Sequence, residues 1–557
     1  MNKKVLAQEM LRHNDMTTTR NYRRGKRNAV ATAVLSCVLS ASVALTACGS
    51  TGDGVTAGDH FGYALDEYLL TTNSASAAGA SSDAQVVTGR LYPGVYVNGP
   101  KGQRIPNTDL VEVRALPGAK AKVEYRITDK AVYSDGQPIT CDSFLLAYVA
   151  GTKRPQFNSY NPLMEQIEQV ECQPGSKIAT VVFREGFGER WRYLFGGGTL
   201  MPAHAMANKL GMSLDQLNIA LHNGEQEELQ PIADLWNTGF ELANFDPALQ
   251  VSSGPYLVES VGDSGEVTLR RNDKYYGEAP ALDKIIIWPK GSDLAALAAD
   301  KRLHVAEVPS VNSTTWVNRD DSKNPYIITP TAGVLTEHLI LGSAGVFVTQ
   351  ERRSAFAACV DQAAVAKASS NVSGVQVKPT TVRTARFNDP VVQHLSYITE
   401  PRMAVDIPAA EMLRGETVRI GYFAPDERKA AMVAAIAQSC QPAGINVVDV
   451  SAEAAIVSML PQTYGDPIKG ETVVEGAADA VLQTIDPQYF FPEAATMTSN
   501  IDAARGAEQY SWDVVKTIPL AQQPAVYVYG KNVANIVDNT DLYGISWNMD
   551  RWQETGN

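Results

Sequence analysis

The spacing of apolar and polar positions predicts short strands and helices that alternate along most of the chain. Residues 123–127 and 267–270 show the two-residue alternation of half-buried strands, and residues 284–288 form a further apolar strand. Residues 143–150 are an apolar run with the length of a short helix. No internal repeat or long low-complexity segment interrupts the pattern. The alternation indicates an α/β fold.

The best-defined unit is a strand, a helix and a second strand in direct succession. Residues 417–423 have the composition of a strand, and Asp426 is placed to cap the helix that follows. Pro442 and Gly444 end this helix before a second strand over residues 445–450. Strands joined in this way pair in parallel through a right-handed crossover. The apolar stripe of the helix consists of Met432, Ile436 and Cys440.

The amino-terminal segment has the pattern of an export signal and not of a folded domain. Its basic start gives residues 1–47 a net charge of about +6, and residues 28–44 are then almost uncharged. This apolar run is short for a membrane-spanning helix, which needs about 20 residues. We therefore expect residues 1–47 to be a signal peptide, with translation starting at Met1 or at Met16.

The signal ends at a cysteine in a distinctive setting. The sequence Leu45-Thr46-Ala47-Cys48 resembles the bacterial lipobox, in which the cysteine is lipidated and becomes the first mature residue. We expect Cys48 to carry a lipid anchor that includes palmitate, on the extracytoplasmic face of the cell membrane. An ordinary signal peptide with a chance cysteine is the alternative. Residues 48–60 are mostly small and polar, and we expect them to form a flexible tether.

Length and charge restrict the class of protein further. About 510 residues remain after the signal, which is too long for one hydrophobic core, so two or more lobes are expected. The chain carries a net charge of −13, and the mature part about −19. An acidic surface argues against binding to nucleic acid.

Four cysteines remain in the mature chain, and an even number in an exported protein favours disulfides. Three pairings are possible. We favour the pairing in which both disulfides lie within one lobe each, and four buried free thiols are the alternative. The favoured pairs are Cys141–Cys172 and Cys359–Cys440.

A further helix is predicted over residues 353–367. Its apolar positions place four side chains inward, and both late cysteines then lie on apolar helix faces, which supports their pairing. The inward side chains are Phe356, Cys359, Val360 and Ala363.

The sequence offers no positive case for catalysis or for a metal. It has no HExxH, P-loop or CxxC motif, and no GxSxG motif between a strand and a helix. Seven histidines are scattered without the spacing of metal ligands. We expect neither enzymatic activity nor a cofactor.

Two stretches carry a specific resemblance. The first is YRITDKAVYSDGQPIT at residues 125–140, and the second combines SGPY at 253–256, VTLRRN at 267–272 and YYGEAPALDKI at 275–285. Both resemble family-five solute-binding proteins of ABC importers, the oligopeptide- and dipeptide-binding group. Weaker matches continue in the same order to the end of the chain.

The resemblance implies an α/β fold with two lobes and mixed sheets flanked by helices. The chain would cross the hinge between the lobes twice, and the ligand would sit in the cleft between them. Lobe I is expected over residues 61–287, lobe II over 288–489, and the chain would return to lobe I over 490–557. Closure of the cleft would trap the ligand.

The chain departs from the peptide-binding pattern at one position. In peptide binders, an acidic residue four positions before a proline pairs with the ammonium of the ligand, and here that position is Gln483. A neutral Gln483 weakens recognition of an ammonium group. Asp486 or Asp479 is a possible substitute. We also expect contacts from the loop after the first strand, which contains Thr72, Asn73 and Ser74.

The resemblance implies a monomeric capture protein that delivers a small peptide or peptide-like solute to ABC permease subunits, which a separate ATPase powers. The protein would contact the membrane through its lipid anchor. The alternative is an orphan lipoprotein that keeps the binding fold and acts as a scaffold or regulator of cell-envelope biogenesis.

Overall fold

The computed structural model describes residues 60–453, 459–460, 462–466, 470–474, 476–491 and 500–555. The predicted signal peptide, Cys48 and nearly all of the tether lie outside the described residues. Within the described ranges, no helix is both long enough and apolar enough to cross a membrane.

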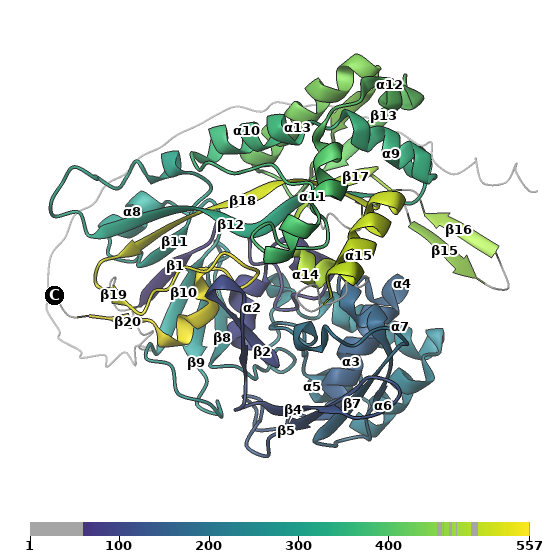
Figure 1. Ribbon diagram of the computed structural model, residues 1–557. Coiled ribbons are helices and arrows are strands. Elements are labelled where there is room, and N and C mark those ends of the chain that lie inside the picture. Colours follow the sequence, from purple (N-terminus) through teal and green to yellow (C-terminus); the bar gives the residue numbers. More distant parts are fainter. Residues whose placement is uncertain are drawn as a thin grey trace, which may run out of the picture. The chain divides into compact units, whose positions relative to one another are not determined.

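Ten strands form one mixed sheet (Figure 1). Parallel pairs occur between β13 and β14 and on both sides of β1, whereas the long central strands are antiparallel. The order across the sheet is β14 (Asn446–Asp449), β13 (Thr417–Gly421), β17 (Ala480–Ile485), β12 (Tyr326–Leu341), β18 (Thr517–Gly530), β11 (Val305–Glu307), β1 (Phe61–Ala64), β10 (Lys284–Trp288), β9 (Val267–Arg271) and β8 (Tyr256–Val261).

The long strands β12 and β18 join the two halves of this sheet. Their register runs from Tyr326 opposite Gly530 to Ile340 opposite Thr517, with register shifts after Ala332 and after Glu337. The end of β12 also pairs with β17, and the end of β18 also pairs with β11. The same two strands therefore belong to both halves, and Figure 1 shows them side by side.

Smaller sheets surround the large one. A four-stranded antiparallel sheet has the order β4 (Val111–Leu116), β5 (Lys122–Ile127), β7 (Ile178–Phe183) and β6 (Ile167–Glu171). Three two-stranded sheets pair β2 (Tyr96–Gly99) with β3 (Gln103–Pro106), β15 (Gln462–Asp466) with β16 (Gly470–Val474), and β19 (Val533–Ala534) with β20 (Gln553–Glu554).

Several longer helices begin at a side chain that caps the first turn. Asp361 caps α10, Asp426 caps α13 and Asn500 caps α15, each by accepting a backbone N–H. The helices are α1 (Ala77–Ser81), α2 (Gln85–Leu91), α3 (Cys141–Thr152), α4 (Arg154–Phe157), α5 (Ala203–Lys209), α6 (Leu214–Asn223), α7 (Gln226–Thr238), α8 (Leu294–Ala299), α9 (Gln350–Cys359), α10 (Gln362–Ser373), α11 (Ser396–Thr399), α12 (Ile407–Ala410), α13 (Glu427–Cys440), α14 (Pro487–Phe490) and α15 (Ile501–Val514).

Three hydrophobic cores hold these elements together. The first core lies mainly within residues 61–287, and the chain returns to it from Tyr527 onward. The second core spans residues 339–520 and includes side chains of α15 and of the start of β18. A small third core lies around Trp288 and Val526. The lobe boundaries expected from the family resemblance stay a prediction, although the segment just after 490 packs with the second core.

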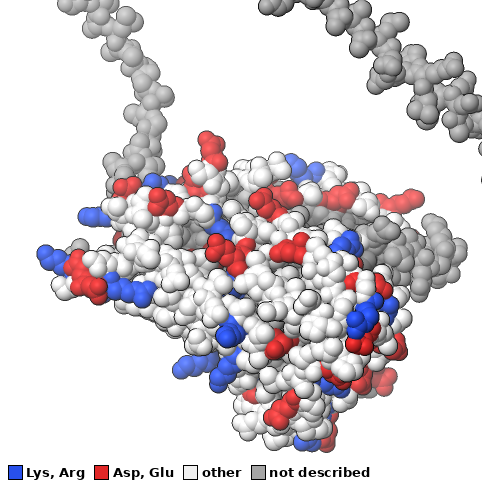
Figure 2. All heavy atoms as spheres, turned by 90° about the horizontal axis from the view of Figure 1, so that it is seen from above, with Lys and Arg blue, Asp and Glu red and all other residues white. Residues whose placement is uncertain are grey.

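The surface carries both signs of charge. On the face shown in Figure 2, acidic and basic side chains are interspersed. The acidic balance of the chain, −13 overall, is therefore not gathered into one patch on that face.

The predicted strands and the strand–helix–strand unit are confirmed. Strands β5, β9 and β10 lie where the alternation placed them, and the apolar run after residue 140 is helix α3. Strands β13 and β14 pair in parallel on either side of α13, with Thr417 opposite Asn446. All three residues of the predicted apolar stripe of α13 are buried: Met432, Ile436 and Cys440.

The helix predicted over residues 353–367 is wrong as one element, because the structure divides it into α9 and α10. Val360 is extended, and Asp361 caps α10 by accepting the N–H of Ala364 at 3.0 Å. A capping carboxylate competes with continuation of the preceding helix. The break shifts the helical phase, so Ala363 is exposed and Val365 is buried.

Both favoured disulfides are present. Cys141 in α3 bonds Cys172 just after β6, and Cys359 at the end of α9 bonds Cys440 at the end of α13. The second bond ties the crossover helix α13 to α9 inside the second core. The favoured pairing of the four cysteines is therefore confirmed, and the free-thiol alternative is wrong.

We expect the loss of the Cys359–Cys440 bond to lower stability strongly. It closes a loop with a sequence separation of 81 residues, for which chain entropy gives about 4.5 kcal/mol, against about 3.7 kcal/mol for the 31-residue separation of Cys141–Cys172. Thermal unfolding of Cys359→Ala/Cys440→Ala and of Cys141→Ala/Cys172→Ala checks this. Reductant should lower the melting temperature of the unmodified protein as well. An unchanged melting temperature in the double variants would contradict it.

Candidate functional site

The loop predicted to contact ligand lies buried against the first core. The Thr72 hydroxyl donates to Gln250 Oε1 at 3.0 Å, and the Asn73 amide donates to the Trp236 carbonyl at 3.0 Å. These two side chains anchor the loop. Ser74 differs, because it lines a cavity between the two large cores.

This cavity, called here the aromatic cavity, brings together residues that are about 400 positions apart. It has a volume of about 110 Å³. Ser74, Gln483 and Asp486 all line it, so the structure collects three of the five predicted ligand residues. Five aromatic side chains from both halves of the chain also line it: Tyr160, Tyr193, Phe195, Tyr489 and Phe490.

Gln483 lies in the middle of β17, opposite His338 of β12, with 7% of its surface exposed. Its amide nitrogen donates to the carbonyl oxygen of Ala80 at 3.1 Å. Only the nitrogen of the amide can face a carbonyl, which settles the orientation of the group. Gln483 Oε1 is buried and accepts no hydrogen bond from the described residues.

Asp486 already has a positive partner. It caps α14, and the Arg386 guanidinium donates to both of its oxygens, Nε to Oδ1 at 3.1 Å. Burial alone would raise the pKa of Asp486, but the charge and hydrogen bonds of Arg386 outweigh burial and hold that pKa below its ordinary value. Asp486 is therefore a neutralised structural acid and a poor partner for a second cation.

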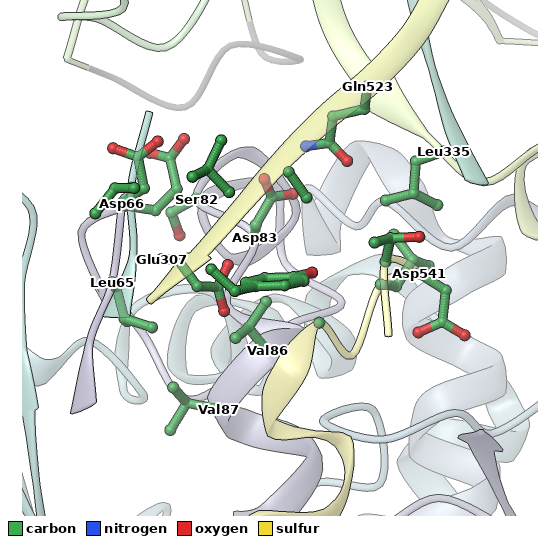
Figure 3. Close-up of a pocket in the computed structure, with 18 of the residues that line it drawn as sticks. Leu65, Asp66, Ser82, Asp83, Val86, Val87, Glu307, Leu335, Gln523 and Asp541 are labelled. Atoms are coloured by element: carbon green, nitrogen blue, oxygen red, sulfur yellow. The ribbon is translucent and has the colours of Figure 1, made fainter. Parts of the chain in front are cut away.

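A second cavity, called here the acidic cavity, adjoins the first and also has a volume of about 110 Å³ (Figure 3). Asp83 and Leu542 line both cavities. No lysine or arginine is among the residues that line either one. Five carboxylates surround the acidic cavity: Asp66, Glu67, Asp83, Glu307 and Asp541.

Asp83 owes its position to the break between two short helices. It follows α1 and precedes α2, with a φ of 47°. Asp and Asn tolerate this left-handed conformation better than most residues. Neither Asp83 nor Asp66 forms a side-chain hydrogen bond or an ion pair with any other described residue, and Figure 3 shows both beside the same cavity.

The enclosed setting of these carboxyl groups favours their neutral form. Burial raises the pKa of Asp66 well above its usual range and the pKa of Asp83 to about 7. Burial also raises the pKa of Glu307 to about 7, although the Tyr63 hydroxyl donates to it, and that of Asp541 to about 6 despite Arg386. Near neutral pH the cavity therefore holds a mixture of protonated and ionised carboxyl groups.

The cations nearest to the acidic cavity stand behind its walls, each beside an acid, and one of these acids is Glu67, which itself lines the cavity. Lys290 Nζ is 3.8 Å from Glu67, and Lys429 Nζ is 3.7 Å from Asp426. Arg428 forms an ion pair with the fully buried Glu337, with Nη2 2.6 Å from Oε1. These pairs reduce the negative field without placing a positive group inside the cavity.

The short helix α14 joins the two large cores beside the aromatic cavity. Tyr489 packs against the first core, whereas Phe490 and Phe491 pack with the second. Arg190 donates to the carbonyl oxygens of Gln488 at 3.0 Å and of Phe491 at 2.7 Å.

Arg104 completes this clamp from β3. It donates to the Tyr489 hydroxyl at 2.8 Å, and its guanidinium lies 4.0 Å from the ring centre of Tyr193 and 4.9 Å from that of Tyr489. Tyr193 donates to Gln488 Oε1 at 3.0 Å. The contacts connect β3 and the segment around residue 190 to α14, and we call them the α14 clamp.

Sequence reasoning missed Asp83, Arg104 and Arg386. Asp83 stands in a stretch of alanine and serine without a motif, and Arg386 is 100 residues away from the acid it pairs with. The sequence offers no local signal for any of the three, because each acts through a contact that only the folded chain creates.

The chain is similar to known solute-binding proteins and lipoproteins. The model of the family "Bacterial extracellular solute-binding proteins, family 5 Middle" matches residues 120–500. An uncharacterized lipoprotein of Mycobacterium tuberculosis is 29% identical over 574 residues, which covers 95% of this chain and 98% of that protein.

Two solved structures show the same fold. The oligopeptide-binding protein AppA of Bacillus subtilis, in complex with a nonapeptide, has a TM-score of 0.64 at 12% identity, covering 90% of this chain and 99% of its own. The periplasmic EDTA-binding protein EppA has a TM-score of 0.62 at 20% identity, covering 90% of this chain and 97% of its own. The fold is therefore the two-lobed α/β fold of periplasmic binding proteins, as the sequence led us to expect.

We expect Glu307→Gln to change how stability depends on pH. The folded pKa of about 7 exceeds the usual 4.5, so the folded state holds more protons than the unfolded state between these values, and stability falls as pH rises through this window. Glutamine cannot ionise and still accepts from Tyr63. The melting temperature of the variant minus that of the original protein should increase by about 2 °C from pH 5 to pH 7.5. Exposed Glu112→Gln is the control, and parallel curves for Glu307→Gln would contradict the assignment.

We expect Arg104→Gln to loosen the α14 clamp. It removes a charged hydrogen bond and the guanidinium–ring contacts, which together contribute about 1–3 kcal/mol. Thermal unfolding should show a lower midpoint, and small-angle scattering should show a larger radius of gyration. Arg114→Gln is the control, because Arg114 is 70% exposed and its pair with Glu124 contributes little. Equal effects of the two substitutions would count against the clamp.

Proposed function

The chain belongs to the bacterial extracellular solute-binding proteins of family 5, and on that premise we propose that it captures peptides or a peptide-like solute for an ABC importer. Members of this family bind solutes and are not enzymes. They work with membrane permeases, to which the bound solute is delivered.

The observation that carries this proposal is the aromatic cavity between the two large cores. Ser74 and Tyr193 come from the first half of the chain, whereas Gln483 and Phe490 come from the second. A site whose walls come from two separately packed cores closes when the cores approach and opens when they part. That arrangement supports capture of a solute by cleft closure.

We also propose that the protein is located at the outer face of the cell membrane. Cys48 would hold it to the outer face of the cell membrane through its lipid, and residues 48–60 would let the folded part reach the permease. Several relatives are named lipoproteins, among them those of Mycobacterium tuberculosis and Mycobacterium leprae. Two disulfides suit an extracytoplasmic protein. We propose that it acts as a monomer.

A second candidate is a scaffold or regulator of cell-envelope biogenesis that keeps the binding fold. The size of the acidic and aromatic cavities favours it, because each holds about 110 Å³ and ligand pockets commonly hold 300 Å³ or more. A protein that had lost its solute would retain such small cavities between its cores. A third cavity, lined by Tyr160, Leu341 and Phe490 among others, holds about 380 Å³, and its size favours the first candidate instead.

A peptide-binding screen tests the first candidate. Protein purified without denaturation is analysed by mass spectrometry for bound solute and then melted in the presence of di- to pentapeptides. A bound peptide, or a rise of several degrees with particular peptides, is expected, since a solute that binds only the folded state stabilises it. No bound solute and no shift with any peptide would favour the scaffold. Arg104→Gln, with its loosened clamp, should show a smaller shift with the same peptides.

A further inference from the structure

We propose that the acidic cavity and the aromatic cavity form one site for a small organic cation, an alkylammonium or guanidinium compound without a carboxylate. The inference rests on the proposed capture function and names the chemical class of the solute. It also narrows that function, because it disfavours ordinary peptides with free carboxyl ends.

The charged side chains that line the acidic cavity all have one sign. The acidic cavity has five carboxylates and no lysine or arginine, whereas both signs mix on the outer face in Figure 2. Buried carboxylates that lack a partner are costly to keep ionised. Asp66 and Asp83 are half-buried and have no hydrogen-bond or ion-pair partner among the described residues. A cation that enters the cavity supplies the missing charge.

Gln483 also offers an acceptor to a cationic solute. Gln483 Oε1 is buried in the wall of the adjoining cavity and accepts no hydrogen bond from the described residues. An unsatisfied buried acceptor costs about 1–3 kcal/mol and calls for a donor. Ammonium and guanidinium groups are donors only. Because Asp83 lines both cavities, one solute can reach the carboxylate of Asp83 and the amide of Gln483 together.

The aromatic walls suit the same chemistry. Cations are attracted to the faces of aromatic rings. The protein itself provides an example, because the guanidinium of Arg104 lies over the rings of Tyr193 and Tyr489. Tyr160 and Phe490, whose ring centres are 5.6 Å apart, line the remaining wall.

The same lining disfavours a carboxylate on the solute. Neither cavity is lined by a lysine or arginine that could bind it. Arg386 stands behind Asp486 and is held by that acid, and its Nη2 is 3.9 Å from Asp541. A carboxylate would therefore meet Asp83 and its neighbours without a compensating charge, which costs several kcal/mol. Each cavity has room for several water-sized groups, enough for a short amine.

Isothermal titration of the full mature chain with agmatine and with putrescine tests the proposal. Three compounds of the same chain length serve as controls: 1,4-butanediol has no charge, 4-aminobutyrate adds a carboxylate and succinate has only carboxylates. We expect agmatine or putrescine to bind at least tenfold more tightly than any control. Asp83→Asn should weaken that binding at least tenfold, and asparagine tolerates the backbone of this position.

Asp320→Asn is the matched control, because Asp320 is exposed and does not line either cavity. Asp66→Asn provides a second test should Asp83→Asn fail to fold. Amine binding that is unchanged in both Asp66→Asn and Asp83→Asn would overturn the proposal. So would the absence of amine binding up to 1 mM.

Binding of peptides and binding of amines are measured separately, so failure of the cation site can be distinguished from failure of the proposed function. If a neutral tripeptide binds and the amines do not, capture of peptides stands and the cation site falls. If the amines bind and peptides do not, the cation site stands and the peptide part of the proposed function falls. If neither class binds, both fall.

Discussion

The antiparallel pairing of β12 with β18 is the constraint on which the rest of this protein depends. Each buried backbone group of these strands needs a hydrogen-bond partner, and the two strands satisfy one another over most of their length. The first core packs near one end of the pair and the second core near the other. Separate cores connected by a shared ribbon leave space between them, and the two cavities lie in that space.

The short helix α14 closes this space on one side, and contacts from both halves of the chain hold it. Asp486 starts α14 and is neutralised by Arg386, so the helix is attached to the second half of the chain by a buried ion pair. Arg104 and Arg190 hold it from the first half. A small rearrangement at α14 therefore changes the relation between the two cores, and opening of the cleft has to break these contacts.

The electrostatics of the cleft differ from those expected of a peptide binder. The position of the usual acid holds Gln483, and the nearest acid, Asp486, is already paired. Negative charge instead gathers on the other side of Asp83, where burial holds the pKa values of several carboxyl groups near neutrality. An acceptor and an unpaired carboxylate remain available to a solute, and no cation lines the walls.

The sequence by itself determined the features that depend on neighbouring residues. Periodicity located β5, β9, β10 and the β13–α13–β14 unit, the number of cysteines favoured the two disulfides, and the motifs between 125 and 285 indicated the family. Only the tertiary structure decided the rest. Asp361 ended α9 because its carboxylate capped α10, which periodicity alone did not show. Asp83, Gln483 and Arg386 acquired their roles through neighbours 100 or more residues away, or through a cavity that both halves of the chain enclose. Burial and the absence of partners are properties of packing, and a linear pattern does not encode them.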